Sequence, residues 1–338
     1  MARSTVYNDI VTDELYEKVN PDNKELLEEF IEYLQSTGKS KLTIVNYTSD
    51  IKICFIWNLQ RNKNKFFIDF TKRDIMKYQN WLLNNLSPSR IRRLRSSISS
   101  MSNFIENILD EDFSKFRNIV NKIPAPDNHP VREKTVFEDE DIEMILKSWI
   151  DDKLYQEACC LALDVGSGAR KAELTRFKVN YFDDENIIYG SLYKTPEKIR
   201  TKGKGGKMLH KFTLVNVFKP YLDLWLEERE RLGIDNEYLF VTKKNNKWIK
   251  AKVSTLDSWA ERINHYTDKH FYFHSCRHYY TTHLSEANIP AEVIKEVVGW
   301  ASVDMVSIYT DTEIDDELGK YFDENGIKQV KQKSLKDL

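Results

Sequence analysis

The chain contains little cysteine, and its few cysteines form no recognisable framework. Only four occur in 338 residues, at positions 54, 159, 160 and 276. None belongs to a Cys-x-x-Cys pair, and no set of cysteines and histidines has the spacing of a zinc site. We therefore predict reduced thiols, with neither a disulfide framework nor a metal site.

Long hydrophobic runs and a targeting segment are also missing. No apolar stretch approaches the roughly 20 residues needed to cross a bilayer. Residues 1–20 are polar and acidic, unlike a signal peptide. We therefore expect a cytoplasmic protein, associated with the nucleoid DNA and without a membrane partner.

An excess of charge of one sign is missing as well. The 51 basic and 53 acidic side chains give a net charge of −2, which by itself does not indicate nucleic-acid binding. The basic residues are clustered, however: segment 87–95 has four arginines and segment 198–211 has six lysines and arginines, both without an acid. Local basic patches govern phosphate affinity more than net charge does. We predict DNA contacts from Arg90, Arg92, Arg93, Arg95, Lys202 and Lys207.

The length of the chain favours two domains. The clearest boundary is segment 123–130, where three prolines in eight residues indicate an extended linker. We predict an N-terminal extension at 1–22, a helical domain at 23–122, a linker at 123–134, a second domain at 135–314 and a tail at 315–338.

The first domain has helical periodicity throughout. Leu26, Phe30 and Leu34 lie on one helical face, and further helices are predicted to begin near Ser40, after Thr71 and at Ser87-Pro88. The last of these has an apolar stripe flanked by the arginines of segment 87–95.

The second domain is predicted to be mixed. Helices are expected at 138–149, 158–163, 217–232, 253–266, 275–286, 290–299 and 304–309. Strands are expected at 186–193 and around 212–215, on either side of a glycine-lysine turn at 202–207. The predicted fold class is mainly α, with a small antiparallel β-sheet in the C-terminal domain.

Two arginines in this domain have the chemistry of a phosphate clamp. Arginine presents a planar fork of donors that matches two phosphate oxygens. Arg170 lies at the predicted start of a helix, where free N–H groups also favour an anion, and Glu173 is one turn further on. Taken alone, an exposed Arg–Glu pair on the surface is the simpler interpretation.

His274 and Arg277 are three residues apart, so a helix places them on one face. A histidine can exchange a proton near neutral pH, and Arg277 would be the second clamp. The alternative is a histidine satisfied in the core beside a surface arginine.

A nucleophile and a general acid complete the predicted site. Tyr309 becomes a nucleophile if cationic neighbours favour its phenolate, although core packing is an equally simple role. Lys204, at the tip of the predicted hairpin, would protonate the oxygen that leaves, with Lys202 and Lys207 as rivals. Trp300 can donate its indole N–H to a phosphate oxygen.

From about residue 23 to residue 310 the chain resembles the tyrosine recombinases, the integrase class of site-specific DNA recombinases. The resemblance rests on segments 168–174, 274–283 and 298–310, which occur in the family's order and at its spacing. It implies a helical core-binding domain followed by a catalytic domain. Trp300 stands where many members have histidine, which limits its role to a hydrogen bond and packing. The implied catalytic residues are Arg170, Lys204, His274, Arg277, Trp300 and Tyr309, with Glu173 in support.

The resemblance also implies an activity and its partners. The enzyme would cut and rejoin DNA strands through a 3′-phosphotyrosyl intermediate, for integration, excision or resolution, without a metal ion, ATP or another cofactor. Its partner would be double-stranded DNA with specific recombination sites, bound by a homotetramer whose C-terminal element docks on a neighbour, and a directionality factor could assist. A type IB-like topoisomerase, a telomere resolvase and a catalytically silent DNA-binding regulator remain alternatives.

Overall fold

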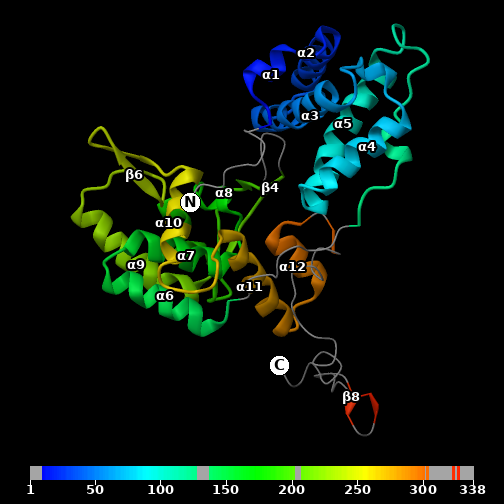
Figure 1. The fold of residues 1–338 in the computed structure, drawn as a ribbon. Coiled ribbons are helices and arrows are strands. Elements are labelled where there is room, and N and C mark those ends of the chain that lie inside the picture. The colour runs from blue at the N-terminus through cyan, green and yellow to red at the C-terminus, as the bar shows by residue number, and fades with distance from the viewer. Residues whose placement is uncertain are drawn as a thin grey trace. The chain divides into compact units, whose positions relative to one another are not determined.

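The computed structural model describes residues 10–127, 137–201, 207–300, 302–303, 322–323 and 326–327. The chain divides into two compact units, Met1–Glu133 and Lys134–Leu338. It is mainly helical with small antiparallel sheets (Figure 1), which confirms the predicted fold class. The predicted limits at residues 22, 122, 134 and 314 stay predictions. In the described segments no helix combines the length and the apolar composition of a membrane span.

The first unit consists of helices that begin where the sequence places their caps. Ser40 accepts a hydrogen bond from the backbone N–H of Thr43, Thr71 and Asp74 form a capping box, and Pro88 occupies the first turn of its helix. The helices are α1 (Asp13–Glu17), α2 (Pro21–Ser36), α3 (Lys41–Arg61), α4 (Lys72–Leu83) and α5 (Pro88–Ile108), with short 3-10 helices at η1 (Phe67–Asp69) and η2 (Val120–Lys122).

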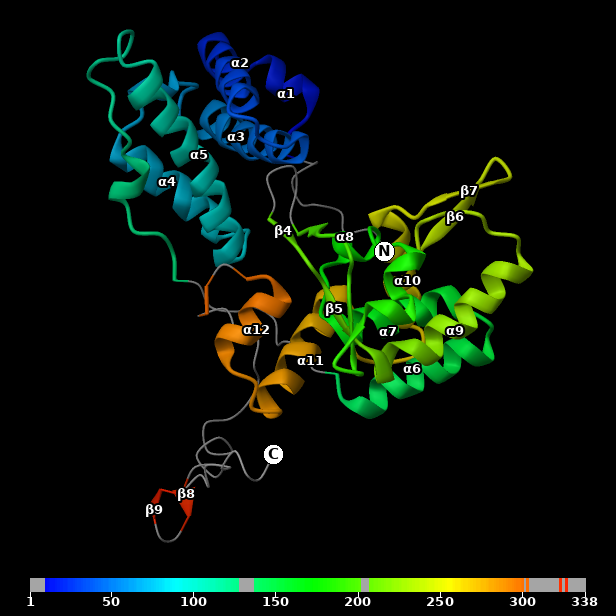
Figure 2. The ribbon, with the colours of Figure 1, turned by 180° about the vertical axis from the view of Figure 1, so that it is seen from behind.

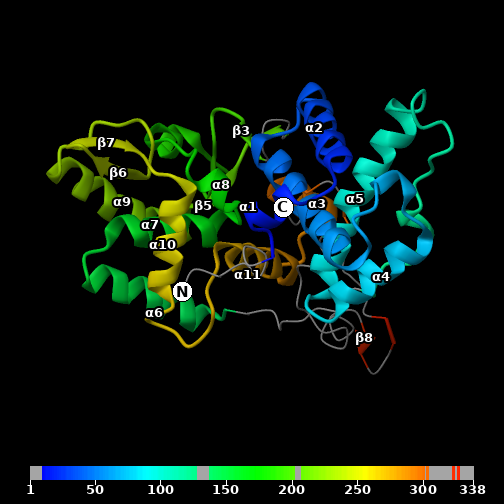
Figure 3. The same cartoon turned by 45° about the horizontal axis from the view of Figure 1, so that its top comes forward.

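The core of the first unit forms where α5 packs against α2, α3 and α4 (Figure 3). The predicted apolar stripe of α5 is buried. Its members are Ile91, Leu94, Ile98, Met101 and Ile105. Because this stripe faces the core, the arginines between its members lie at the edge of the helix.

The second unit is built around a buried helix, α7 (Tyr155–Ser167). Every residue from Ala158 to Ser167 is buried, because α6, α9 and α11 pack around it (Figure 1). The other helices are α6 (Asp139–Asp151), α8 (Lys171–Leu174), α9 (Val215–Arg231), α10 (Val253–Ile263), α11 (Phe273–Glu286) and α12 (Ala291–Val298), with 3-10 helices η3 (Val179–Phe182) and η4 (Asp184–Asn186).

The strands of the second unit correct part of the prediction. The single strand expected at 186–193 is two strands, β1 (Ile187–Ile188) and β2 (Leu192–Lys194), because Tyr189 and Gly190 both take positive φ and turn the chain. Strand β5 (Phe212–Leu214) pairs antiparallel with β2, so β1, β2 and β5 form one sheet.

Three further strand pairs accompany this sheet. β3 (Ile199–Arg200) pairs with β4 (Met208–Leu209), β6 (Val241–Lys244) with β7 (Lys247–Lys250), and β8 (Phe322–Asp323) with β9 (Gly326–Ile327). The β6–β7 hairpin, visible in Figure 2, was not predicted. Asn245 and Asn246 make its turn with positive φ angles, which is typical of tight hairpins.

Candidate active site

A glycine at the end of α7 brings Arg170 into position. Gly168 takes a left-handed conformation with φ of 53°. A Cβ atom there would lie 2.6 Å from Cδ1 of Tyr280, so both the backbone angle and the space favour glycine. The turn ends α7 and leaves Arg170 as the N-cap residue of α8.

Arg170 is held by a buried carboxylate. Its Nη1 lies 3.0 Å from Oε1 of Glu173, and its backbone N–H donates to Oε2 over 3.1 Å. Its Nη2 donates to the carbonyl of Gly299 over 3.2 Å. The Arg170 side chain is 31% exposed while that of Glu173 is completely buried, so the pair is not the exposed surface pair of the simpler interpretation.

A second cation on Glu173 was missed by the sequence analysis. Nζ of Lys211 lies 2.7 Å from Oε2 of Glu173, and the lysine side chain is only 1% exposed. The sequence did contain a signal for this. Residues two apart on a strand point to the same side, and Lys211 lies two residues before Thr213 of β5; both are buried.

Arg277 is fully buried rather than a surface residue. Its Nη1 donates to the carbonyl of Gly168 and its Nη2 to the carbonyl of Val298, each over 2.8 Å. Its guanidinium carbon lies 5.2 Å from the ring centre of Trp300, which is also buried. Arg170 and Arg277 thus bind consecutive carbonyls at the end of α12.

His274 lies in the first turn of α11, near both arginines. The pKa of His274 is lowered to about 4, first by desolvation and then by the charges of Arg277, His278 and Arg170. Its ring is nonetheless exposed, so solvent screening moderates these effects. At neutral pH a histidine with this pKa is uncharged and can accept a proton.

The structure therefore brings together five of the predicted residues, Arg170, Glu173, His274, Arg277 and Trp300. Lys202, Lys204, Tyr309 and the predicted helix 304–309 lie outside the described residues. Lys207 is exposed just before β4. Within the described ranges no group of three or more side chains has the arrangement of a metal site.

The predicted DNA-binding arginines of α5 differ in their surroundings. Arg90 and Arg93 lie 2.7 and 3.4 Å from the carboxylate of the buried Asp50. Arg92 is exposed and donates to the carbonyl of Pro126.

Arg95 is the buried one of the four predicted arginines. Its Nη2 donates to the carbonyls of Val120 and Ile123 over 2.9 and 2.5 Å, while its Nη1 donates to Gln79. Its guanidinium is therefore engaged within the helical unit, and its DNA contact stays a prediction.

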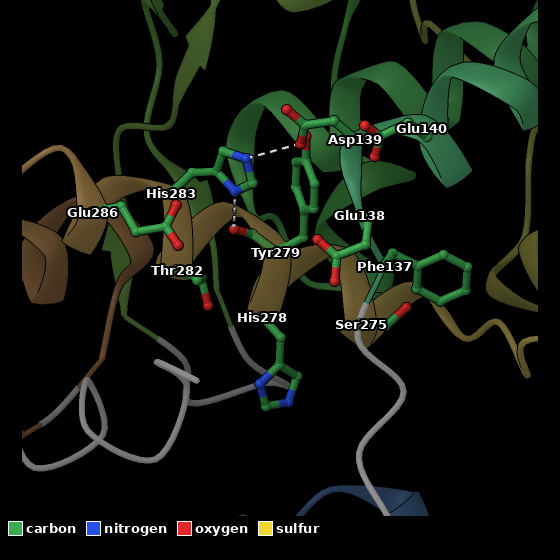
Figure 4. A pocket seen from close by; sticks show the side chains of 10 residues that line it. All are labelled: Phe137, Glu138, Asp139, Glu140, Ser275, His278, Tyr279, Thr282, His283 and Glu286. Atoms are coloured by element: carbon green, nitrogen blue, oxygen red, sulfur yellow. Dashed lines mark hydrogen bonds and ion pairs between the residues drawn. The ribbon is translucent and has the colours of Figure 1, made fainter. Parts of the chain in front are cut away.

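A pocket on α11 is distinct from the arginine cluster (Figure 4). Its volume is about 430 Å³. Oδ1 of Asp139 accepts a hydrogen bond from the hydroxyl of Tyr279 over 2.6 Å and lies 3.0 Å from Nε2 of His283. Four carboxylates line it and no arginine does, which does not suit a phosphate. The lining residues are Phe137, Glu138, Asp139, Glu140, Ser275, His278, Tyr279, Thr282, His283 and Glu286.

Comparisons with known families match both units. Residues 135–315 match the phage integrase family, and residues 26–115 match the N-terminal SAM-like domain of phage integrases. The SPbeta prophage-derived recombinase-like protein YomM of Bacillus subtilis is 30% identical over 256 residues, covering 74% of this chain and 73% of that protein. Tyrosine recombinase XerA of Pyrococcus horikoshii is 29% identical over 293 residues, covering 85% and 89%.

Solved structures show the same fold at low sequence identity. XerH recombinase bound to a palindromic difH substrate, in a post-cleavage complex, matches with a TM-score of 0.63 and 17% identity, over 93% of this chain and 90% of that one. A lambda integrase dimer bound to a COC′ core site matches with a TM-score of 0.62 and 18% identity, over 85% and 95%.

Proposed function

The chain belongs to the phage integrase family and is a tyrosine recombinase; from this premise we propose that it cuts and rejoins DNA at specific sites through a 3′-phosphotyrosyl intermediate. The observation that carries the proposal is that Arg170 donates a hydrogen bond to the carbonyl of Gly299, 129 residues further along the chain. Arg277 donates to the neighbouring carbonyl, that of Val298. Preorganised donors of this kind stabilise the charge that develops on a phosphate under attack.

The charge balance of the site favours an anion. Among the residues that the structure describes, Arg170 and Lys211 share one carboxylate, that of Glu173, and Arg277 lies nearby. Asp164 also lies near Arg277, and burial raises the pKa of its carboxyl well above its usual range. Arg170 is partly exposed and presents the excess charge to solvent, whereas Arg277 adds fixed charge from the interior.

In the proposed reaction the hydroxyl oxygen of Tyr309 attacks the scissile phosphorus. The bond from phosphorus to the 5′-oxygen breaks, and Lys204 or Lys202 donates a proton to that oxygen. Neutral His274 accepts the phenol proton. The freed 5′-hydroxyl of a partner strand then attacks the phosphotyrosine and releases Tyr309. Bond energy is kept in the phosphotyrosine, so the exchange consumes no ATP.

The proposed partner is double-stranded DNA carrying a recombination site, at which the protein acts as a homotetramer in the cytoplasm. The support is likeness: the XerH and lambda integrase structures are bound to DNA, and a lambda integrase tetramer bound to a Holliday junction has the same fold with a TM-score of 0.61. We also propose that a directionality factor selects between integration and excision.

Covalent trapping tests the proposal. Inverted repeats flanking the gene supply the trial site, and a nicked duplex that loses its 5′-hydroxyl fragment after cleavage traps the adduct. The wild-type protein should give a protein–DNA adduct that survives denaturation, and Tyr309→Phe should abolish it while DNA affinity stays within about twofold, because the substitution removes one oxygen and no charge.

The proposal fails if Tyr309→Phe still forms the adduct, or if the wild-type protein forms none on any flanking repeat. Relaxation of a supercoiled plasmid without such a repeat would point instead to the topoisomerase alternative.

A further inference from the structure

Lys211 is a buried cation that the proposed reaction steps do not use. It lies between β4 and β5, and its backbone is fixed on both sides by Thr195. The Lys211 N–H donates to Oγ1 of Thr195 over 3.0 Å, and the Thr195 N–H donates to the Lys211 carbonyl over 2.9 Å. This pairing continues the β2–β5 ladder and directs the lysine side chain into the interior, where it is 1% exposed.

The partner of Lys211 is the same carboxylate that orients Arg170. Oε2 of Glu173 lies 2.7 Å from Nζ of Lys211 and accepts the backbone N–H of Arg170, while Oε1 takes Nη1 of Arg170. Glu173 thus carries one negative charge between two cations. Both Glu173 and Lys211 are out of contact with water, so their interactions are little screened.

We infer that Lys211 is a positioning residue: it fixes the Glu173 carboxylate that holds Arg170, and it balances that carboxylate so that the charge of Arg170 stays available for a phosphate. Without Lys211, the Glu173 carboxylate would either neutralise Arg170 or rotate away and no longer hold it. The inference rests on the proposed function, because it explains how Arg170 of the proposed active site is held in position with its charge available for a phosphate.

The ionisation of Lys211 gives this inference a pH signature. In the described part of the chain, three charged groups face the ammonium: Glu173, Arg170 and Arg277. Burial lowers the pKa of Lys211, Glu173 opposes that shift, and the two arginines add to it. A bound phosphate favours the charged lysine, so phosphate affinity should fall as the pH rises through a value below the ordinary lysine pKa.

The test uses inorganic phosphate as the probe, with binding followed through the Nε–Hε NMR signal of Arg170 in the full chain. Lys211→Met removes the charge and keeps similar volume, and it should weaken phosphate binding about tenfold, the effect of one unscreened charge nearby. The matched control is Lys171→Gln, a more exposed lysine next to Arg170 that pairs with Asp257; it should leave the affinity within about twofold.

Two further variants separate positioning from a general structural role. Lys211→Arg keeps the charge, so it should restore most of the phosphate affinity and move the alkaline loss of affinity to higher pH. Arg170→Gln, with binding now followed on backbone amides, should remove the effect of Lys211→Met, since Lys211 is inferred to act through Arg170. If Lys211→Met does not fold, Lys211→Gln, which keeps a donor for Glu173, takes its place.

Phosphate affinity unchanged in Lys211→Met, or an equal loss in the Arg170→Gln background, would overturn the inference. The adduct assay separates this from the proposed function. A protein that binds phosphate through Arg170 and Lys211 but forms no phosphotyrosyl adduct contradicts only the proposed function. A protein that forms the adduct while Lys211→Met keeps full phosphate affinity contradicts only the inference.

Discussion

Asp50 in the first unit and Glu173 in the second are buried carboxylates that each contact two cations. The two sites differ in how far those cations are exposed to solvent. Asp50 takes Arg90 and Arg93, whose side chains are 21% and 50% exposed, and a hydroxyl from Ser97. Glu173 takes Arg170, which is 31% exposed, and Lys211, which is buried. The acids are alike, but only the second holds a cation that water cannot reach.

This difference separates a structural ion pair from a site prepared for an anion. At Asp50 both arginines come from α5 and the acid from α3, so the cluster fastens one helix to another, and solvent moderates the charges. At Glu173 one of the two cations, Lys211, is shielded from water, so on the proposed function its charge would act on an incoming phosphate with less screening. On the proposed function, the same residue types serve helix packing at Asp50 and phosphate binding at Glu173.

The largest expected difference between the two sites is in the stability lost when each carboxylate is replaced. Glu173→Gln leaves Lys211 buried without its countercharge and should lower the free energy of unfolding by about 3–5 kcal/mol. Asp50→Asn should cost about 1–2 kcal/mol, because its two arginines can turn to water. Guanidinium denaturation at pH 7 measures both, and equal losses would break the comparison. Adduct formation should fall only in Glu173→Gln.

Arg92 and Arg95 of α5 test whether an arginine of the first unit must be exposed to contact DNA. Arg92→Gln should reduce the slope of log affinity against log salt by about one, the signature of one lost phosphate contact, with little change in stability. Arg95→Met should leave the slope unchanged and cost about 2–3 kcal/mol, since the carbonyls of Val120 and Ile123 lose a charged donor. Fluorescence anisotropy with labelled duplex DNA measures the slope. A reduced slope for Arg95→Met at unchanged stability would support the DNA contact predicted for Arg95.

The sequence predicted the features that depend on local signals. The starts of α3, α4 and α5 follow from Ser40, Thr71 and Pro88, because capping and proline preferences act within one helical turn. The three segments that carry Arg170, Arg277 and Trp300 were likewise recognisable from their own residues.

Features that depend on distant partners were missed or misjudged. Lys211 is buried because β5 pairs with β2, and Arg95 because segment 120–123 returns to α5. Neither partner is visible from the residues beside these cations. The simpler interpretation of Arg277 as a surface residue fails for the same reason, since its acceptors, Gly168 and Val298, lie 109 and 21 residues away.

The titration of His274 measures the electric field at the Glu173 site. Its pKa of about 4 in the folded protein, against an ordinary value near 6.5, means that the folded state binds fewer protons than the unfolded state between these pH values. Stability should therefore fall as the pH falls through this window and should not depend on His274 above it. An NMR titration of the ring should show the low midpoint in the free protein, and a higher one when phosphate is added or when Arg170→Gln removes a cation. A midpoint near 6.5 that ignores both changes would mean that the arginine cluster produces no net positive field at His274.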